Sequence, residues 1–379
     1  MFTSTARRVS VLGVVLGVAS LTACAKDTPA AKDDGIGPVS VKATDSECSL
    51  SRRDVKSGTS TFSVSNGGSK VTEFYVYADG DRVMGEVENV GPGLKRDLIV
   101  ELPTGKYQAV CKPGMAGDGI RGDLTVTGDA PAQVDEDTLL KQAADSYQRY
   151  VNSQAVALEQ KTAEFVTAVK AGDVAKAKAL FPVSRTYWER IEPVAESFGD
   201  LDPKIDARVN DVEPGTEWTG YHRIEQALWV SNTTKGMEKY ADQLLVDVKT
   251  VVAKAKVVKL NPLQLANGAK ELLDEVATGK VTGEEDRYSH TDLWDFQANV
   301  EGSQAAVQAL RPALQTRDAA LVTQLDTNFK AVFAALDKYR EGDGFKTYTA
   351  TEAEKKQLGA VVDGLAEPVS KVAGVIAQK

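Results

Sequence analysis

Residues 138–170 read TLLKQAADSYQRYVNSQAVALEQKTAEFVTAVK, a run without glycine or proline. Its apolar residues recur at steps of three and four, the spacing that places them on one face of an α-helix. The run therefore predicts a helix of about 35 residues, roughly 50 Å long at 1.5 Å per residue. A helix of that length needs other helices to cover its apolar face, so it indicates a helical domain.

The chain after this run repeats the helical pattern in shorter pieces, separated by glycine and proline. We expect further helices over 173–180, 184–198, 204–211, 217–230, 236–259, 262–277, 291–310, 316–339 and 351–377. Residues 131–379 are therefore predicted to form an all-α, bundle-like domain.

Before the helical run, the pattern changes to the period of two that is typical of strands. Thr61–Ser65, Thr72–Tyr77 and Asp97–Leu102 are rich in β-branched and aromatic residues, and 106–111 and 123–127 continue the series. Turn sequences such as Asn-Gly-Gly and Lys-Pro-Gly separate them. Short strands at this spacing predict an all-β sandwich over residues 39–130.

The first 24 residues are predicted to be a lipoprotein signal peptide rather than part of the fold. Arg7 and Arg8 precede a short apolar segment, and Leu21-Thr-Ala-Cys24 resembles a bacterial lipobox with Cys24 as the lipidated residue. Export without a lipid, with cleavage after Ala23, is the alternative. Residues 25–38 are expected to be a flexible tether.

The overall charge restricts the classes of partner. The chain has 379 residues and a net charge of -9. Its content of hydrophobic residues, 42%, is that of an ordinary globular protein. This charge argues against nucleic acid and anionic lipid surfaces as partners, and it suits the capture of cations.

Two cysteines remain if Cys24 carries lipid, and they allow two interpretations. Cys48 and Cys111 could form a structural disulfide in an oxidising compartment. They could instead bind a soft metal such as copper together with Met115, with Glu73 as a further ligand. No histidine occurs in residues 39–130, which excludes a blue-copper centre with two histidine ligands.

The predicted helix over 217–230 contains His222, which is one of only two histidines in the chain. The carboxylate of Glu225 follows three residues later. Residues at this spacing share a helix face, so both side chains can reach one ion. Glu189 and Glu192 have the same spacing on another predicted helix. The alternatives are a core histidine beside a surface glutamate, and a solvated acidic face.

Three stretches together resemble the EfeO family, the envelope iron-binding components of the tripartite EfeUOB iron-uptake system. They are Gly220-Tyr-His-Arg-Ile-Glu225, Tyr187-Trp-Glu-Arg-Ile-Glu192 and the segment 283–302. The resemblance covers about residues 39–379. It implies a cupredoxin-like domain followed by an imelysin-like, peptidase-type helical domain.

The resemblance also implies which residues bind metal. The family's His-x-x-Glu motif matches His222 and Glu225, and its acidic cluster matches Glu189, Glu192, Asp206 and Glu285. The ligands suggested for the cupredoxin-like domain match Cys48, Glu73, Cys111 and Met115. The implied partners are a membrane iron permease and a haem peroxidase, and lipidation would hold the chain on the outer face of the cytoplasmic membrane.

The ligand chemistry agrees with iron as the cargo. One imidazole with several carboxylates suits Fe(II), Fe(III), Mn or Zn better than Cu(I). Thiolate and thioether ligands in the β-domain suggest the hypothesis that copper there transfers electrons to or from iron.

Two other functions compete with iron capture. A zinc metallopeptidase of the imelysin type would need a carboxylate-rich site, since no His-Glu-x-x-His motif is present. A surface binder of acidic polysaccharide is disfavoured by the negative charge. We therefore expect a binding protein rather than an enzyme, without an organic cofactor.

Overall fold

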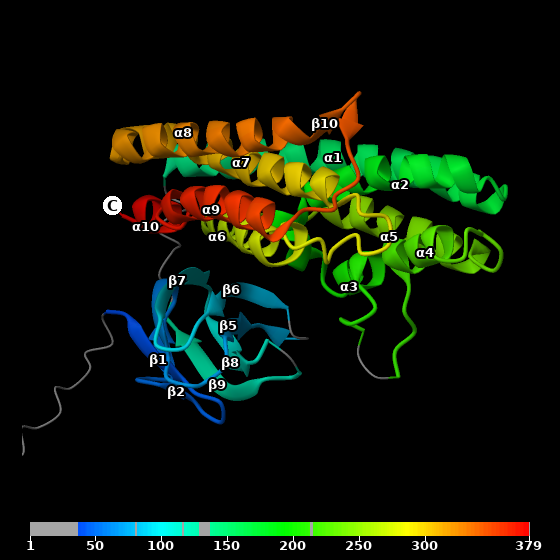
Figure 1. Cartoon of the computed structure of the whole chain (residues 1–379). Coiled ribbons are helices and arrows are strands. Elements are labelled where there is room, and N and C mark those ends of the chain that lie inside the picture. The colour runs from blue at the N-terminus through cyan, green and yellow to red at the C-terminus, as the bar shows by residue number, and fades with distance from the viewer. Residues whose placement is uncertain (1–36, 80–81, 116, 129–136, 213–214, 379) are drawn as a thin grey trace, which may run out of the picture. The chain divides into compact units, whose positions relative to one another are not determined.

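The computed structural model describes residues 37–79, 82–115, 117–128, 137–212 and 215–378. The predicted signal peptide, Cys24 and nearly all of the tether lie outside these residues. The part of the chain from Gly37 onward forms one compact unit, in which a β-sandwich precedes a helical domain (Figure 1). The predicted fold class is confirmed.

Two sheets form the sandwich. One has the strand order β2-β1-β4-β7 and the other the order β3-β9-β8-β5-β6. The strands are β1 (Val39–Ala43), β2 (Cys48–Leu50), β3 (Asp54–Lys56), β4 (Gly58–Asn66), β5 (Thr72–Tyr77), β6 (Val83–Val90), β7 (Lys95–Leu102), β8 (Gly105–Pro113) and β9 (Ile120–Thr127). The five strand segments expected from the sequence lie within β4, β5, β7, β8 and β9, and none of these segments covers β1, β2, β3 or β6.

Strand β5 is buried on both faces. Phe74 and Val76 point into the core of the sandwich, as the alternation of a strand requires. The residues that alternate with them, Glu73, Tyr75 and Tyr77, belong to the other face of the sheet and are also buried. This outer face therefore needs a cover, and its residues line cavities shared with the helical domain.

A disulfide joins Cys48 on β2 to Cys111 on β8, and so links the two sheets. Neither sulfur is then a thiolate, the form that binds metal. The hypothesis of a copper site with cysteine ligands is therefore wrong for the chain as the structure has it.

The helical domain is built on α1 (Thr138–Lys170), which lies along α2 (Val174–Glu189), α5 (Glu238–Ala255) and α7 (Asp292–Arg317). Buried residues recur along α1 at the predicted spacing, from Leu140 to Val169. The other elements are η2 (Glu192–Phe198), α3 (Leu201–Asp206), α4 (Gly220–Trp229), α6 (Pro262–Glu275), η3 (Val276–Lys280), α8 (Ala319–Leu336), η4 (Asp337–Tyr339), β10 (Arg340–Glu341), β11 (Gly344–Phe345), α9 (Glu352–Val369) and α10 (Val372–Ile376).

Two prolines do not end helices as we expected. Pro182 lies inside α2 and Pro312 inside α7, where each removes one backbone hydrogen bond. Pro182 is buried, so packing against the neighbouring helices offsets that loss. As a result α2 continues to Glu189. Separately, the helix predicted over 204–211 begins and ends earlier, as α3.

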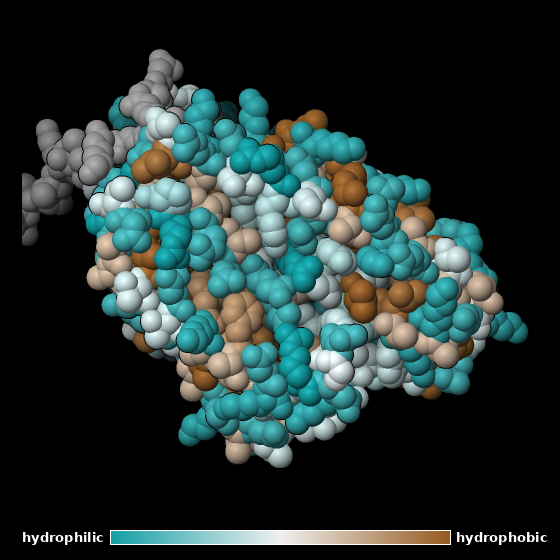
Figure 2. Space-filling model, turned by 90° about the horizontal axis from the view of Figure 1, so that it is seen from above, coloured by the Kyte–Doolittle hydropathy of each residue, from teal (hydrophilic) through white to brown (hydrophobic). Residues whose placement is uncertain are grey.

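The visible face in Figure 2 is mainly hydrophilic, with hydrophobic side chains in small separate groups. Within the described residues, we find no helix with the length and apolar character needed to cross a bilayer. The apolar faces of the helices instead meet in one large core.

We expect Cys48→Ser/Cys111→Ser to lower the free energy of unfolding of the β-sandwich by about 2–4 kcal/mol, because the disulfide closes a long loop in the unfolded chain. Urea unfolding followed by circular dichroism measures this change. All four tryptophans lie in the helical domain, so their fluorescence should report an unchanged domain. Reducing the wild type should reproduce the loss and leave the double variant unaffected; equal stability of variant and wild type would contradict the prediction.

Candidate metal centre

The six residues predicted as ligands in the helical domain all reach one buried cluster. Glu189 ends α2, Glu192 begins η2, Asp206 ends α3, and His222 and Glu225 lie on α4. Glu285 comes from the segment between η3 and α7. Apart from Glu192, which is mostly buried, these residues are less than a tenth exposed. The solvated-face alternative is therefore wrong for these glutamates.

The start of α4 brings His222 to Asp206. Gly220 has φ +83°, and a Cβ there would lie 2.2 Å from the carbonyl oxygen of Ile205. Only glycine allows α4 to begin this close to the end of α3. His222 follows two residues later on α4, and its Nε2 lies 3.7 Å from Asp206 Oδ1.

Glu225 orients His222 instead of facing the same open position. Its Oε2 lies 2.8 Å from His222 Nδ1, and its Oε1 accepts hydrogen bonds from the backbone N–H groups of Tyr288 and Ser289. With both oxygens engaged, Glu225 holds the imidazole ring as carboxylates behind metal-binding histidines do.

The second ring nitrogen of His222 makes no hydrogen bond although the residue is only 1% exposed. It faces Asp206 Oδ1 and Glu285 Oε1, the latter at 3.5 Å. One atom from each of these three residues lies within 4.8 Å of the others. A buried ring nitrogen that faces two carboxylate oxygens without a hydrogen bond to either is a position that a cation could fill.

Charges around His222 determine its protonation. Burial and Arg185 lower its pKa, but the hydrogen bond to Glu225 and the nearby carboxylates of Glu285 and Asp206 outweigh them and raise the pKa to about 9. Metal binding at Nε2 must therefore displace a proton at neutral pH.

Arg185 lies at the centre of the cluster and was not predicted. Its guanidinium group has no exposure, and it pairs with Glu189 Oε1 at 2.6 Å and with Asp206 Oδ1. It also pairs with Asp295 at 3.3 Å and Glu285 at 3.5 Å. The i,i+4 spacing of Arg185 and Glu189 was the only signal in the sequence, and it is equally typical of exposed pairs.

The surroundings shift the pKa values of these carboxylates in opposite directions. Burial raises the pKa of Asp286 and of Asp295 well above the usual range, against the effect of Arg185. Burial also acts on Glu285, but Lys280, His222 and Arg208 outweigh it and hold its pKa well below the usual range. Glu285 is therefore the ionised carboxylate beside His222. Asp286 and Asp295 were missed because only the fold turns them inward.

A cavity of about 430 Å³ leads to these residues and is lined from both domains. Glu73 and Met115 line it from the β-sandwich, together with Asp206 and Glu285 from the helical domain. The structure therefore divides the four ligands suggested for the β-domain into two pairs. Cys48 and Cys111 are bonded to each other, whereas Glu73 and Met115 line the cavity.

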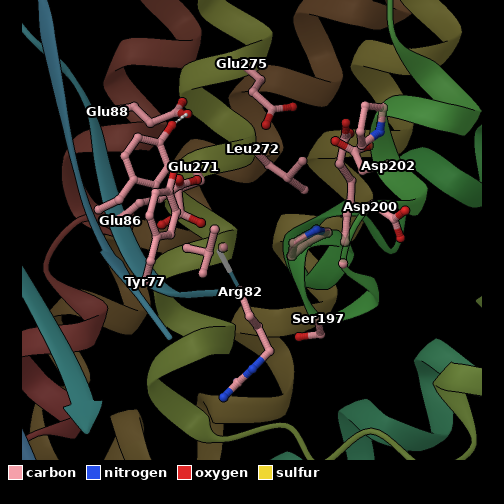
Figure 3. Close-up of a pocket in the computed structure, with 18 of the residues that line it drawn as sticks. Tyr77, Arg82, Glu86, Glu88, Ser197, Asp200, Asp202, Glu271, Leu272 and Glu275 are labelled. Atoms are coloured by element: carbon pink, nitrogen blue, oxygen red, sulfur yellow. Dashed lines mark hydrogen bonds between the residues drawn. The ribbon is translucent and has the colours of Figure 1, made fainter. Parts of the chain in front are cut away.

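A second cavity of about 610 Å³ shares Glu88, Glu192, Asp202 and Glu275 with the first. Figure 3 shows Tyr77 and Glu88 on the side of the strands, Asp200 and Asp202 on the opposite side, and Glu275 between them. Carboxylates from both domains thus surround the approach to His222, which favours cations.

The fold and this cluster define a class: proteins with a cupredoxin-like sandwich before an imelysin-type helical domain that contains a buried histidine–carboxylate centre. The family described as Imelysin matches residues 143–372, and the Cupredoxin-like domain matches residues 13–126. The iron uptake system component EfeO of Escherichia coli K12 is 42% identical over 89% of this chain and 91% of its own length. EfeO of Shigella flexneri is similar to the same extent. The chain belongs to the EfeO family.

We expect His222 to titrate near pH 9 in the metal-free protein, so that the stability due to its protonation is complete below about pH 6.5 and is lost as the pH rises through about 9. Glu225→Gln should lower this pKa by about one unit or more, because it removes a charged partner. NMR titration measures both values, and His290→Asn assigns the signals because the chain has only two histidines. A His222 pKa that stays unchanged in Glu225→Gln would contradict the role of Glu225.

Proposed function

We propose that this chain captures iron in the helical domain and delivers it to a membrane permease. The observation that carries the proposal is the buried Nε2 of His222, which has no hydrogen-bond partner and faces Asp206 and Glu285 at the end of an acidic cavity. The names of the relatives, iron uptake system components, support iron as the cargo.

The donor set suits iron. One imidazole nitrogen and two carboxylate oxygens are ligands for Fe(II), Fe(III) and Mn(II), and carboxylate charge favours the ferric ion. Glu189 supplies a further carboxylate beside Asp206, although Arg185 and Asn299 already bind its two oxygens. We therefore assign His222, Asp206 and Glu285 as ligands, Glu225 as the residue that orients His222, and Glu189 and Glu192 as neighbours that adjust the charge.

In this proposal the β-sandwich does not transfer electrons, which is the role that its cysteine and methionine residues suggested. Its cysteines are bonded to each other, so electron transfer through a copper–thiolate centre has no support. Glu73 and Met115 line the cavity instead, and the domain forms a wall of the path by which the ion enters.

The two competing functions lose support. Within the described residues, His222 is the only histidine in the groups that could hold an ion, which is unusual for a catalytic zinc site. The relatives are also named as uptake components and not as enzymes. An acidic polysaccharide would meet the carboxylates of both cavities.

The partners and the location proposed for this chain rest on its resemblance to the family. A permease and a haem peroxidase of the same system are the proposed partners. Lipidation of Cys24 would hold the chain on the outer face of the cytoplasmic membrane, which raises its effective concentration beside the permease.

We expect the chain from residue 25 to bind Fe(II) under anaerobic conditions, and His222→Ala and Glu285→Gln each to weaken binding by about 100-fold or more. Loss of a residue that only orients a ligand costs about 10–100-fold, and we expect that smaller loss for Glu225→Gln. Titration calorimetry measures the affinities, and circular dichroism verifies folding. His290→Ala is the matched control and should bind as the wild type does. Equal binding by His222→Ala and the wild type would refute the site.

A further inference from the structure

Lys280 is a buried cation to which the proposed function assigns no role. It is the last residue of η3, a π-helical turn that continues α6, and its side chain is 3% exposed. Four carboxylate oxygens surround its ammonium group: Glu189 Oε2 and Glu275 Oε2 at 3.5 Å, and Glu192 Oε2 and Glu285 Oε2 at 3.8 Å.

These four carboxylates come from four separate parts of the chain. Glu189 ends α2, Glu192 begins η2, Glu275 ends α6, and Glu285 follows η3. A π-turn inserts an extra residue into a helix and is frequent at functional sites. Here it turns the Lys280 side chain into the group of carboxylates, and Gly279 allows a close approach, since a Cβ there would lie 3.3 Å from Glu285 Oε2.

The position of the ammonium group is next to the proposed iron position. Glu285 connects the two, because its Oε1 faces His222 Nε2 at 3.5 Å while its Oε2 faces Lys280 at 3.8 Å. A carboxylate that presents one oxygen to each of two cation positions is the usual bridge in sites with two metal ions. The protein therefore has two neighbouring cation positions and fills one of them with its own side chain.

The contacts of Lys280 differ from those of Arg185. Arg185 makes a charge-assisted hydrogen bond of 2.6 Å with Glu189, as a structural ion pair does. The ion pairs of Lys280 are all 3.5 Å or longer, so charge rather than directed hydrogen bonding holds the ammonium group. Carboxylate oxygens are suitable ligands for a divalent metal ion, and Glu275 and Glu285 could supply them here, while Glu189 Oε2 and Glu192 Oε2 already accept hydrogen bonds from Asn299.

We infer that Lys280 is a tethered cation that excludes a second metal ion and limits this chain to one ion at His222. The inference rests on the proposed iron site and adds the residue that determines its stoichiometry. A fixed positive charge beside the bound ion also weakens the hold of the carboxylates on it, which suits a protein that must release its cargo.

The test counts metal ions on the full-length chain, with Mn²⁺ as a probe that does not change oxidation state under these conditions. We expect the wild type to bind one Mn²⁺ and Lys280→Met to bind two, with a spin-coupled pair in the electron paramagnetic resonance spectrum. Lys280→Arg keeps the charge and should bind one. Lys280→Met/Glu275→Gln removes a ligand of the new position and should also bind one.

The outcomes separate this inference from the proposed function. One ion on Lys280→Met, or two on the wild type, overturns the inference and leaves the iron site intact. No ion on the wild type refutes the proposed site itself.

Lys280→Met leaves several carboxylates without their cation, so folding must be verified by circular dichroism. If Lys280→Met does not fold without metal, the bound Mn²⁺ ions are counted on Lys280→Gln instead, because its amide group can donate hydrogen bonds to the carboxylates. Folding of either variant only with two equivalents of Mn²⁺ supports the inference. Failure of both to fold at any Mn²⁺ concentration overturns it, because Lys280 is then a structural cation.

Discussion

The guanidinium group of Arg185, with no exposure to solvent, is the interaction on which the helical domain depends. Transfer of this charge from water costs several kcal/mol, and only close carboxylates can offset that cost. The carboxylates come from α2, α3, α7 and the segment before α7, so these elements must meet at one point. The ion cluster therefore restricts the arrangement of the helices more strictly than their apolar faces do, since apolar contacts are not directional.

The same cluster contains the proposed metal position, among acidic residues that would otherwise repel each other. Arg185, Lys280 and Arg208 neutralise part of the charge, and burial raises the pKa of Asp286 and of Asp295. What remains is the His222 ring nitrogen with two carboxylates and a cavity that leads to it. Stability and the proposed cargo binding thus use the same residues, and an ion that enters would compete with cations that the chain supplies itself.

The β-sandwich shows how tertiary structure can change the meaning of a ligand pattern. Cysteine, methionine and glutamate in one domain resemble a soft metal site as long as their partners are unknown. In the folded chain the cysteines bridge the two sheets, and Glu73 and Met115 line a cavity with the helical domain. The domain therefore contributes a wall to the proposed iron path, and its metal-binding residue types do not form a second centre together.

The sequence by itself determined the features that depend on neighbours along the chain. Periodicity determined the long helix α1 and the order of a sandwich before a helical domain, and the spacing of His222 and Glu225 placed both on one helix face. Only the tertiary structure decided which partners those side chains have. It made Glu225 an orienting residue, kept α2 intact through Pro182, and brought the unpredicted Arg185 and Lys280 into the cluster. The physical reason is that a charge pair or a proline has the same local pattern whether it is buried or exposed, while its energy depends on the segments that fold against it.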